Sequence, residues 1–572
     1  MIQKKYFLFI LFIFLIHFSG AVNAQVSVNV STTDPVYRDI DKLVAQGLVD
    51  KIIVGQRPYS RKEIARITAE AIRHLPRLEE NLSNPKNSDS KKASIQSRID
   101  AVQNILDRLK KDYAEELVQI KAVEGQTSDY SIHPLEKAEV DLTVLRSRPT
   151  TLIPSNGIGN IDAVVNPLVN NRQGRHLVNG TNLSLETSHW LRASNYWAFY
   201  FRPRFQLAWG WQGSNNDHRV DLINGYTKVG FGNFEIEAGR DHLLWGQGEN
   251  SGLQLSNNPR GLDMVKLSND SPFILPSFLK YLGAHKLSFF YADLGPEQFF
   301  PRSYLVGYKW SLQPVSFFEV GFSSMTLGGG RGAPAGSIGD QMRDILFLGS
   351  VSGIQVSNKI TGFEGRFRIP PLRGTEVYLE YMFDDIHRAD FKTWFVQDAG
   401  QIAGLYVPRL LNDGSLDLRF EYHRTGLRYY RHGQFLSGNT LNSFILGDAL
   451  GPNAQGVYGT MKWDINTQNL LTFKGSYEKR GSNIYTAISH DPVNRPTAVD
   501  QFIVVANGPS EKRISFDAAW FYRFKNKPFS LRTDFGYEHV QNEGFVAGRN
   551  ANHVRGQLAF QVDLDRFTKY PQ

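Results

Sequence analysis

A strict alternation of apolar and polar residues runs through Leu416-Asp417-Leu418-Arg419-Phe420-Glu421-Tyr422-His423. Successive side chains of a β-strand point to opposite faces, so the leucine, phenylalanine and tyrosine side chains share one face and the polar side chains share the other. The apolar face is rich in aromatic residues, and the polar face is densely charged. This combination is typical of a transmembrane β-strand, with one face toward lipid and the other toward a wet lumen.

The same period of two continues from about residue 135 to the C-terminal end of the chain. At roughly 24 residues per strand and connection, this length predicts about 18 strands, and about 16 is equally compatible because bacterial barrels have even strand numbers. A soluble β-sandwich or propeller would need an internal repeat of roughly 40 to 50 residues, which the sequence does not contain. We therefore predict an all-β, antiparallel transmembrane barrel. The alternation is clearest in residues 197–209, 363–369, 376–383, 471–478, 516–524, 531–538 and 554–564.

The N-terminus has the features of a secretory signal peptide. Lys4 and Lys5 precede an apolar run, and the small-residue pattern Val22-Asn23-Ala24 follows it. We expect cleavage after Ala24. Beyond that point, no uninterrupted apolar stretch approaches the roughly 18 residues of a transmembrane helix. Because only helices and closed barrels satisfy their backbone groups in lipid, we expect an outer-membrane barrel in contact with outer-membrane lipid and lipopolysaccharide.

Composition excludes several classes of function. The 572 residues include no cysteine, so there is no disulfide framework, thiolate metal site or cysteine nucleophile. The net charge is +8, and removal of the two signal-peptide lysines would leave +6 (8 minus 2). That charge is too mild and too interspersed for nucleic-acid binding. The H-E-x-x-H and G-x-S-x-G motifs are absent, so we expect no enzyme, metal or cofactor; a hydrolase assembled only in three dimensions remains an alternative.

Residues from about 34 to 124 have a helical period instead, which predicts three amphipathic helices. Ser60 to Glu63 form a capping box that opens a helix, Pro76 stops that helix, and a later helix has an apolar stripe from Ile95 to Tyr113. Such stripes must be buried, and a core of about 90 residues is small, so we expect the helices to dock on the barrel. The domains that we predict are a signal peptide (1–24), a small α-helical bundle capping the periplasmic side of the barrel (25–130) and the barrel itself (131–572).

Two neighbouring motifs carry a family resemblance. Gly239-Arg240-Asp241-His242-Leu243-Leu244-Trp245-Gly246-Gln247-Gly248 is followed closely by Leu253-Gln254-Leu255-Ser256-Asn257-Asn258-Pro259-Arg260. The tryptophan-glycine turn leading into a serine-asparagine-asparagine segment resembles the capsule assembly protein Wzi family, although Gln247 stands where proline is usual and Pro259 interrupts the usual Asn-Ala-Arg. The resemblance implies a barrel of about 18 strands that acts as a lectin attaching or organising capsular or other surface polysaccharide, without catalysis. We expect a monomer.

The helical region resembles a second module. Residues 39–71 are similar to a degenerate S-layer homology unit, a module that can bind cell-wall polymers. A single copy is weak evidence for wall binding, and a purely structural plug or plinth for the barrel is the favoured alternative.

The segment from Arg240 to Arg260 has the chemistry of a sugar site. Sugar recognition needs aromatic faces for the ring and planar polar groups for paired hydroxyls. The segment lies between strand-like residues 231–238 and 286–291, which is too long a gap for a simple turn. The alternative is a structural loop inside the lumen, with its asparagines and arginines bonded to carbonyls. The predicted polysaccharide ligands are Arg240, Asp241, His242, Trp245, Gln247, Asn250, Asn257, Asn258 and Arg260.

Inward-facing arginines are compatible with two different linings of the lumen. They could form a basic lining for an acidic polysaccharide, or they could pair with glutamates as in porin interiors. A diffusion porin for sugars or anions is therefore the alternative function. An open channel would favour the porin, and a plugged lumen would favour the lectin. The arginines are Arg202, Arg204, Arg366, Arg368 and Arg419, and the glutamates are Glu364, Glu376, Glu380 and Glu421.

Overall fold

The computed structural model covers most of the chain. The predicted signal peptide (1–24) and the predicted ligand Asn250 lie outside the described residues. The described residues are 25–83, 88–126, 128–153, 155–166, 168–211, 213–249, 251–334, 337–345, 356–384, 395, 398–488, 501–525 and 527–565.

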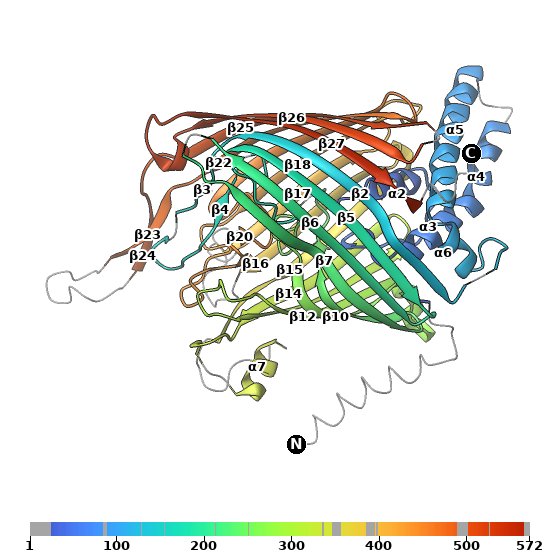
Figure 1. Ribbon diagram of the computed structural model, residues 1–572. Helices are drawn as coiled ribbons and strands as arrows, with labels where there is room; N and C mark the ends of the chain where they lie inside the picture. The colour runs from blue at the N-terminus through green and yellow to red at the C-terminus, as the bar shows by residue number, and fades with distance from the viewer. Residues whose placement is uncertain are drawn as a thin grey trace.

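An antiparallel barrel of 18 strands is the main feature of the described chain, which confirms the predicted fold (Figure 1). It closes where the last strand pairs with the first, Phe560 lying opposite Val140. In chain order the strands are β2 (Tyr130–Arg146), β5 (Gly180–Ala193), β6 (Trp197–Gly210), β7 (Asp217–Phe231), β8 (Phe234–Asp241), β10 (Leu262–Asn269), β12 (Ala284–Asp293), β13 (Tyr304–Val315), β14 (Phe318–Gly328), β15 (Ser357–Ile369), β16 (Thr375–Asp384), β17 (Ala399–Val407), β18 (Leu416–Thr425), β21 (Ala454–Asp464), β22 (Asn469–Arg480), β25 (Glu511–Arg523), β26 (Phe529–Gln541) and β27 (Ala551–Asp563).

Alternate side chains along each strand point outward from the barrel and inward to its lumen, as predicted. Phe420 and Phe363 are each 47% exposed on the outer face, whereas the neighbouring Glu364 is only 1% exposed inside. Aromatic and aliphatic side chains continue around the outer face from strand to strand, which would be unfavourable in water and is the surface that a lipid bilayer requires. No described helix has the length and apolar character needed to cross a membrane.

The two ends of the barrel differ in their connections. At one end the strands are joined by short turns, such as residues 232–233 and 316–317. At the other end the connections are long, as in residues 294–303 and 426–453. The N-terminal helices lie at the end with the short turns, and the hairpin of β23 (Asn483–Ile488) and β24 (Gln501–Ala506) projects from the opposite end (Figure 1).

The helical region contains more helices than the three that the sequence pattern predicts. Ser60 caps its helix as expected, its hydroxyl accepting a hydrogen bond from the Glu63 N–H at 3.0 Å. Pro76 does not simply end that helix but begins another, because proline lacks only an N–H that a first helical turn leaves free. The helices share one apolar core. They are α2 (Val36–Ala45), α3 (Arg61–His74), α4 (Pro76–Ser83), α5 (Asp89–Asp112) and α6 (Ala114–Gln119).

Ion pairs join the helices to the barrel. Arg38 of α2 contacts Asp417 of β18 at 2.7 Å and Asp464 of β21 at 2.7 Å. Lys62 of α3 lies 2.9 Å from Asp270, just beyond β10. Burial by itself would lower the pKa of Lys62, but the Asp270 carboxylate outweighs it and raises that pKa. The ammonium group therefore stays charged at the junction.

Strand β10 corrects the sequence interpretation of residues 239–285. Those residues are not one long connection, because β10 lies within them and pairs with both β8 and β12. The part that leaves the barrel wall is residues 242–261, which we call the inner segment.

The remaining short strands and the remaining α-helix lie in the connections. They are β1 (Gln56–Arg57), β3 (Thr150–Thr151), β4 (Val164–Val165), β9 (Leu244–Trp245), β11 (Phe273–Ile274), β19 (Thr440–Leu441), β20 (Phe444–Ile445) and α7 (Ile338–Ile345).

Candidate functional site

The inner segment lies inside the barrel and is held from the helical end. Asp241 and Leu262, which flank it, are directly paired partners on β8 and β10, so the segment is an excursion from an otherwise regular hairpin. The loop before α3 enters the lumen and pairs as β1 with β9 of the inner segment. The Val54 N–H donates to Glu319 of β14 at 2.7 Å, which fixes this loop to the wall.

Connections from the opposite end hold the inner segment from the other side. The Ser256 N–H donates to the Leu446 carbonyl at 2.9 Å, in the inward part of residues 426–453. The Gln173 N–H donates to the Asn257 carbonyl at 2.7 Å, in the connection between β2 and β5. Four pieces of chain therefore fill one side of the lumen, and we call them together the plug: the inner segment, the loop before α3, residues 426–453 and the connection between β2 and β5.

An apolar cluster binds these pieces to the strands from β10 to β17. Trp245 is 2% exposed and packs on Phe290 of β12 with ring centroids 5.2 Å apart. Leu253 and Leu255 of the inner segment join the same cluster, together with Leu441 from the opposite end. The plug is therefore a packed core rather than a loosely inserted loop.

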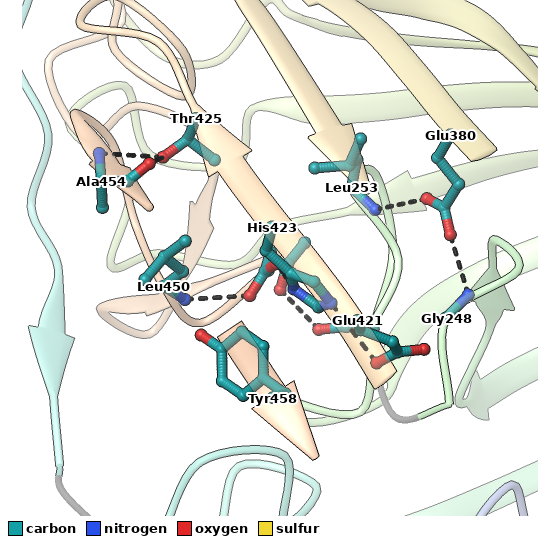
Figure 2. Close-up of polar contacts among 12 residues, drawn as sticks. Gly248, Leu253, Glu380, Glu421, His423, Thr425, Leu450, Ala454 and Tyr458 are labelled. Atoms are coloured by element: carbon teal, nitrogen blue, oxygen red, sulfur yellow. Dashed lines mark hydrogen bonds and ion pairs between the residues drawn. The ribbon is translucent and has the colours of Figure 1, made fainter. Parts of the chain in front are cut away.

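Glu380 of β16 fixes the turn of the inner segment (Figure 2). Its carboxylate accepts backbone N–H bonds from Gln247 at 2.6 Å, Gly248 at 3.0 Å and Leu253 at 3.1 Å. A Cβ on Gly252 would lie 2.0 Å from the Trp245 carbonyl oxygen, so only glycine fits where the two arms of the turn approach each other. The glycines of the sequence motif thus serve backbone packing.

The predicted ligands at the end of β8 and the start of the inner segment contact protein groups. Arg240 holds Asp263 of β10 through two bonds of 2.6 and 2.8 Å. Asp241 accepts from Asn29 at 2.7 Å and from Asn224 at 2.6 Å, and the buried His242 lies 3.2 Å from Asn224. These side chains join the N-terminal segment, β7 and β10.

The remaining predicted ligands are engaged in the same way. Gln247 donates to Glu319 at 3.0 Å and accepts from Arg366 at 2.7 Å. Asn257 accepts from the Thr32 hydroxyl at 2.6 Å, and Asn258 donates to the Ile445 carbonyl at 3.0 Å. Arg260 donates to Asp263 and to the Gly261 carbonyl. The structure brings the described members of the predicted set together as internal contacts of the plug, and the large cavity described next is lined by other residues.

A cavity of about 670 Å³ occupies the other side of the lumen. It lies between the plug and the wall formed by strands β18 to β27, β2, β5 and β6, and Glu249 and Ser251 of the inner segment face it. Its size is in the range of small-ligand sites. Arginine, lysine, aspartate and glutamate side chains dominate the lining, with serine, threonine and glutamine between them.

His423 of β18 lies at the border between cavity and plug (Figure 2). Its Nδ1 is 2.5 Å from Asp448, and its Nε2 is 3.4 Å from Glu421. A catalytic triad would place a nucleophile hydroxyl at the histidine nitrogen remote from the carboxylate. Both ring nitrogens of His423 face carboxylates. His423 is therefore arranged as the cation of an ion-pair network rather than as a base beside a nucleophile.

The inward arginines are paired with acids, as one of the two sequence interpretations predicts. Arg202 and Arg204 both contact Glu186, at 2.7 and 2.6 Å. Arg366 and Arg368 both contact Glu376 on the adjacent strand β16. The fifth, Arg419, packs over Tyr406 at 4.3 Å and lies 3.7 Å from Asp41 of α2. The other named glutamates have different partners: Glu364 contacts Lys309, Glu380 binds backbone, and Glu421 contacts Tyr378 and His423.

Three other cationic side chains that line the cavity make fewer contacts with acidic groups. Within the described chain, Lys474 of β22 makes no hydrogen bond or ion pair, and Arg172 donates only to the side-chain oxygen of Gln557, at 2.6 Å. Arg532 of β26 contacts Asp534, yet half of its side chain remains exposed toward the lumen. Alternation places Lys474 and Arg532 on inward faces, but only the three-dimensional pairing shows which cations lack acids.

Comparisons with known proteins identify the family of the chain. Residues 159–554, well over half of the chain, match the family model described as capsule assembly protein Wzi. Among solved structures, the chain is similar to Wzi from Escherichia coli, an outer-membrane, carbohydrate-binding β-barrel involved in group 1 capsule assembly. The TM-score is 0.61 at 17% identity, covering 94% of this chain and 99% of that one. OprD from Pseudomonas aeruginosa also matches, with a TM-score of 0.39 at 10% identity, covering 78% of this chain and 98% of that one.

No curated protein matches the chain. The structural similarity to Escherichia coli Wzi shows the fold, and the apolar outer surface of the closed barrel is that of an outer-membrane protein. By the match over residues 159–554, the chain belongs to the capsule assembly protein Wzi family.

Proposed function

We propose that this protein is a lectin-like component of the outer membrane that binds surface polysaccharide and organises it at the cell, without catalysis. The observation that carries the proposal is the lumen, which combines a packed plug with a charged cavity of about 670 Å³. A plug suits a binding protein better than a diffusion channel. Membership of the capsule assembly family supports the same role.

The differing ends of the barrel support an orientation for the proposed lectin. Bacterial barrels have short periplasmic turns and longer extracellular loops, so the helical region would face the periplasm and residues 426–453 would face the medium. The helices would then close the periplasmic mouth, consistent with the predicted role of residues 25–130. The buried core that these helices share and their ion pairs to the barrel favour a structural support over a separate wall-binding module.

The contacts of the inner segment support an indirect role for the predicted ligands. The burial of Trp245 and the pairing of Arg240 with Asp263 leave these groups committed to the protein. We propose that they hold the plug, and that the plug presents Glu249 and Ser251 to the cavity. Sugar contacts would then come mainly from the barrel wall.

Cell-attached polysaccharide tests the proposed function. Deletion of the gene should move surface polysaccharide from the cells into the medium, and the wild-type gene should restore it. Planar-bilayer recordings of the purified protein separate this role from the porin alternative. Near-silent bilayers together with loss of attachment support the lectin, whereas large, steady currents with unchanged attachment support the porin.

A further inference from the structure

We propose that Lys474, Arg172 and Arg532 form a subsite for the carboxylate of an acidic sugar, so that the bound polysaccharide is anionic. This inference rests on the proposed polysaccharide-binding function and specifies its ligand. The three side chains come from β22, from the connection between β2 and β5, and from β26, and all three line the cavity.

The register of the strands explains why Lys474 has no acidic partner. Lys474 lies directly opposite Asp517 of β25. The Asp517 carboxylate is instead engaged by Arg555 of β27, at 2.6 Å. Lys474 is left half-buried, facing the cavity, with no described carboxylate in contact.

Most inward-facing lysines of the described barrel contact an acid, which makes this situation unusual. Lys228 contacts Glu235 at 2.8 Å, Lys266 contacts Glu237 at 2.9 Å, and Lys309 contacts Glu364 at 2.6 Å. A charge removed from water is costly unless it is paired, so these lysines follow the usual rule. Lys474 departs from it at the place where the lumen has room for a ligand.

Two arginines complete the positive region. Arg172 donates to Gln557 and has no described acidic partner. Arg532 binds Asp534 through Nε at 2.8 Å and Nη2 at 2.9 Å, and half of its side chain remains exposed toward the cavity. Burial, followed by the repulsion of Arg555 among other groups, lowers the pKa of Arg172, so a neighbouring anion would be favourable. Planar guanidinium groups match a carboxylate through paired hydrogen bonds.

The surroundings of the three cations suit a sugar rather than a bare anion. Ser476, Ser515 and Thr472 present hydroxyl groups on the same wall, and Gln561 adds an amide. Phe521 contributes an aromatic side chain to the lining. Hydroxyls, amides and an aromatic face are what a pyranose ring requires.

Binding of defined oligosaccharides tests this subsite. Purified full-length protein in detergent is titrated calorimetrically with trigalacturonate, with maltotriose as the neutral probe, and with inorganic phosphate. The wild type should bind trigalacturonate more tightly than maltotriose, and Lys474→Gln should weaken trigalacturonate binding about tenfold, or ~1.4 kcal/mol. Lys474→Arg should keep most of the affinity. Lys479→Gln, which removes the same charge from an exposed position of the same strand, should bind like wild type.

The outcomes separate this inference from the function on which it rests. Equal binding of trigalacturonate and maltotriose would leave polysaccharide binding intact and overturn the anionic subsite. Binding of neither sugar would overturn both. Phosphate binding that depends on Lys474 without trigalacturonate binding would make this a simple anion site and contradict the inference. Heat-modifiable gel mobility checks that each variant is folded, and wild-type affinity in folded Lys474→Gln and Arg172→Gln variants would also contradict it.

Discussion

Arg38 on helix α2 and Asp417 on strand β18 form an ion pair across the junction between bundle and barrel, with 2.7 Å between Nη2 and Oδ2. Asp464 of β21 takes another guanidinium nitrogen of the same arginine at 2.7 Å. Both partners of the first pair are largely buried, so the geometry of the docked helices depends on this arginine.

Replacing Arg38 should loosen the helical region without unfolding the barrel. Arg38→Ala leaves Asp417 without its partner, and breaking a buried pair costs about 3–5 kcal/mol. Limited proteolysis should cut residues 36–119 much faster, while the barrel keeps its heat-modifiable mobility. Arg77→Ala is the matched control, because the Arg77–Asp50 pair is exposed on the helices. Equal proteolysis of both variants would show that the Arg38 contacts do not secure docking.

Trp245→Ala should lower the thermal stability of the protein and leave its affinity for sugar nearly unchanged. The side chain is 2% exposed and packs on Phe290, so its loss leaves a cavity that costs about 3–5 kcal/mol. The temperature at which the gel mobility shifts should fall, and trigalacturonate affinity at low temperature should stay near that of wild type. A variant with wild-type thermal resistance but no sugar binding would instead make Trp245 a direct ligand.

Glu380→Gln should open the lumen. The carboxylate accepts three backbone N–H groups of the inner segment, and the substitution replaces one accepting oxygen with a donor that faces N–H groups. Unmade bonds of buried groups cost about 1–3 kcal/mol each. Planar-bilayer recordings should show frequent openings that the wild type lacks. Silent bilayers from the folded variant would mean that the apolar cluster alone holds the plug.

The free-energy cost of a charged side chain on the outer face should depend on how deep that side chain lies in the membrane. Phe420, 47% exposed near the middle of β18, should tolerate arginine poorly, at about 2–4 kcal/mol for a residue at the bilayer midplane. Trp463 near the end of β21 provides the matched control, since the cost near an interface is about 0–1 kcal/mol. Folding yields in lipid vesicles measure both variants. Equal yields for Phe420→Arg and Trp463→Arg would place the membrane elsewhere on the barrel.

The sequence predicts the barrel well where its interior is polar, and less well where the plug touches the wall. Residues 416–423 alternate clearly because their inward side chains face charged groups. Leu262 and Met264 of β10 face the apolar cluster of the plug instead, and Asp263 lies between them on the opposite face, so the polar-inward, apolar-outward alternation is lost at the start of this short strand. The sequence pattern therefore does not indicate a strand at β10 within residues 239–285.

The candidate site shows a second limit of sequence interpretation. The motif around Trp245 and Asn258 identifies the family and the inner segment, but its residues contact the protein. Lys474 is recognisable from the sequence only as an inward-facing lysine. Its lack of a partner arises because Arg555, from a strand close to the C-terminus, engages Asp517. Such competition between distant side chains has no local sequence signal.

The amount of polysaccharide that remains on the cells is the quantity most closely tied to the proposed function. Cells lacking the gene are compared with the same cells carrying either the wild-type gene or Lys474→Gln, and attached and released polysaccharide are measured separately. We predict that the deletion releases polysaccharide into the medium, that the wild type restores attachment, and that Lys474→Gln restores it only in part although the barrel is folded in the membrane. Equal attachment with and without the gene would contradict a role in binding and organising surface polysaccharide.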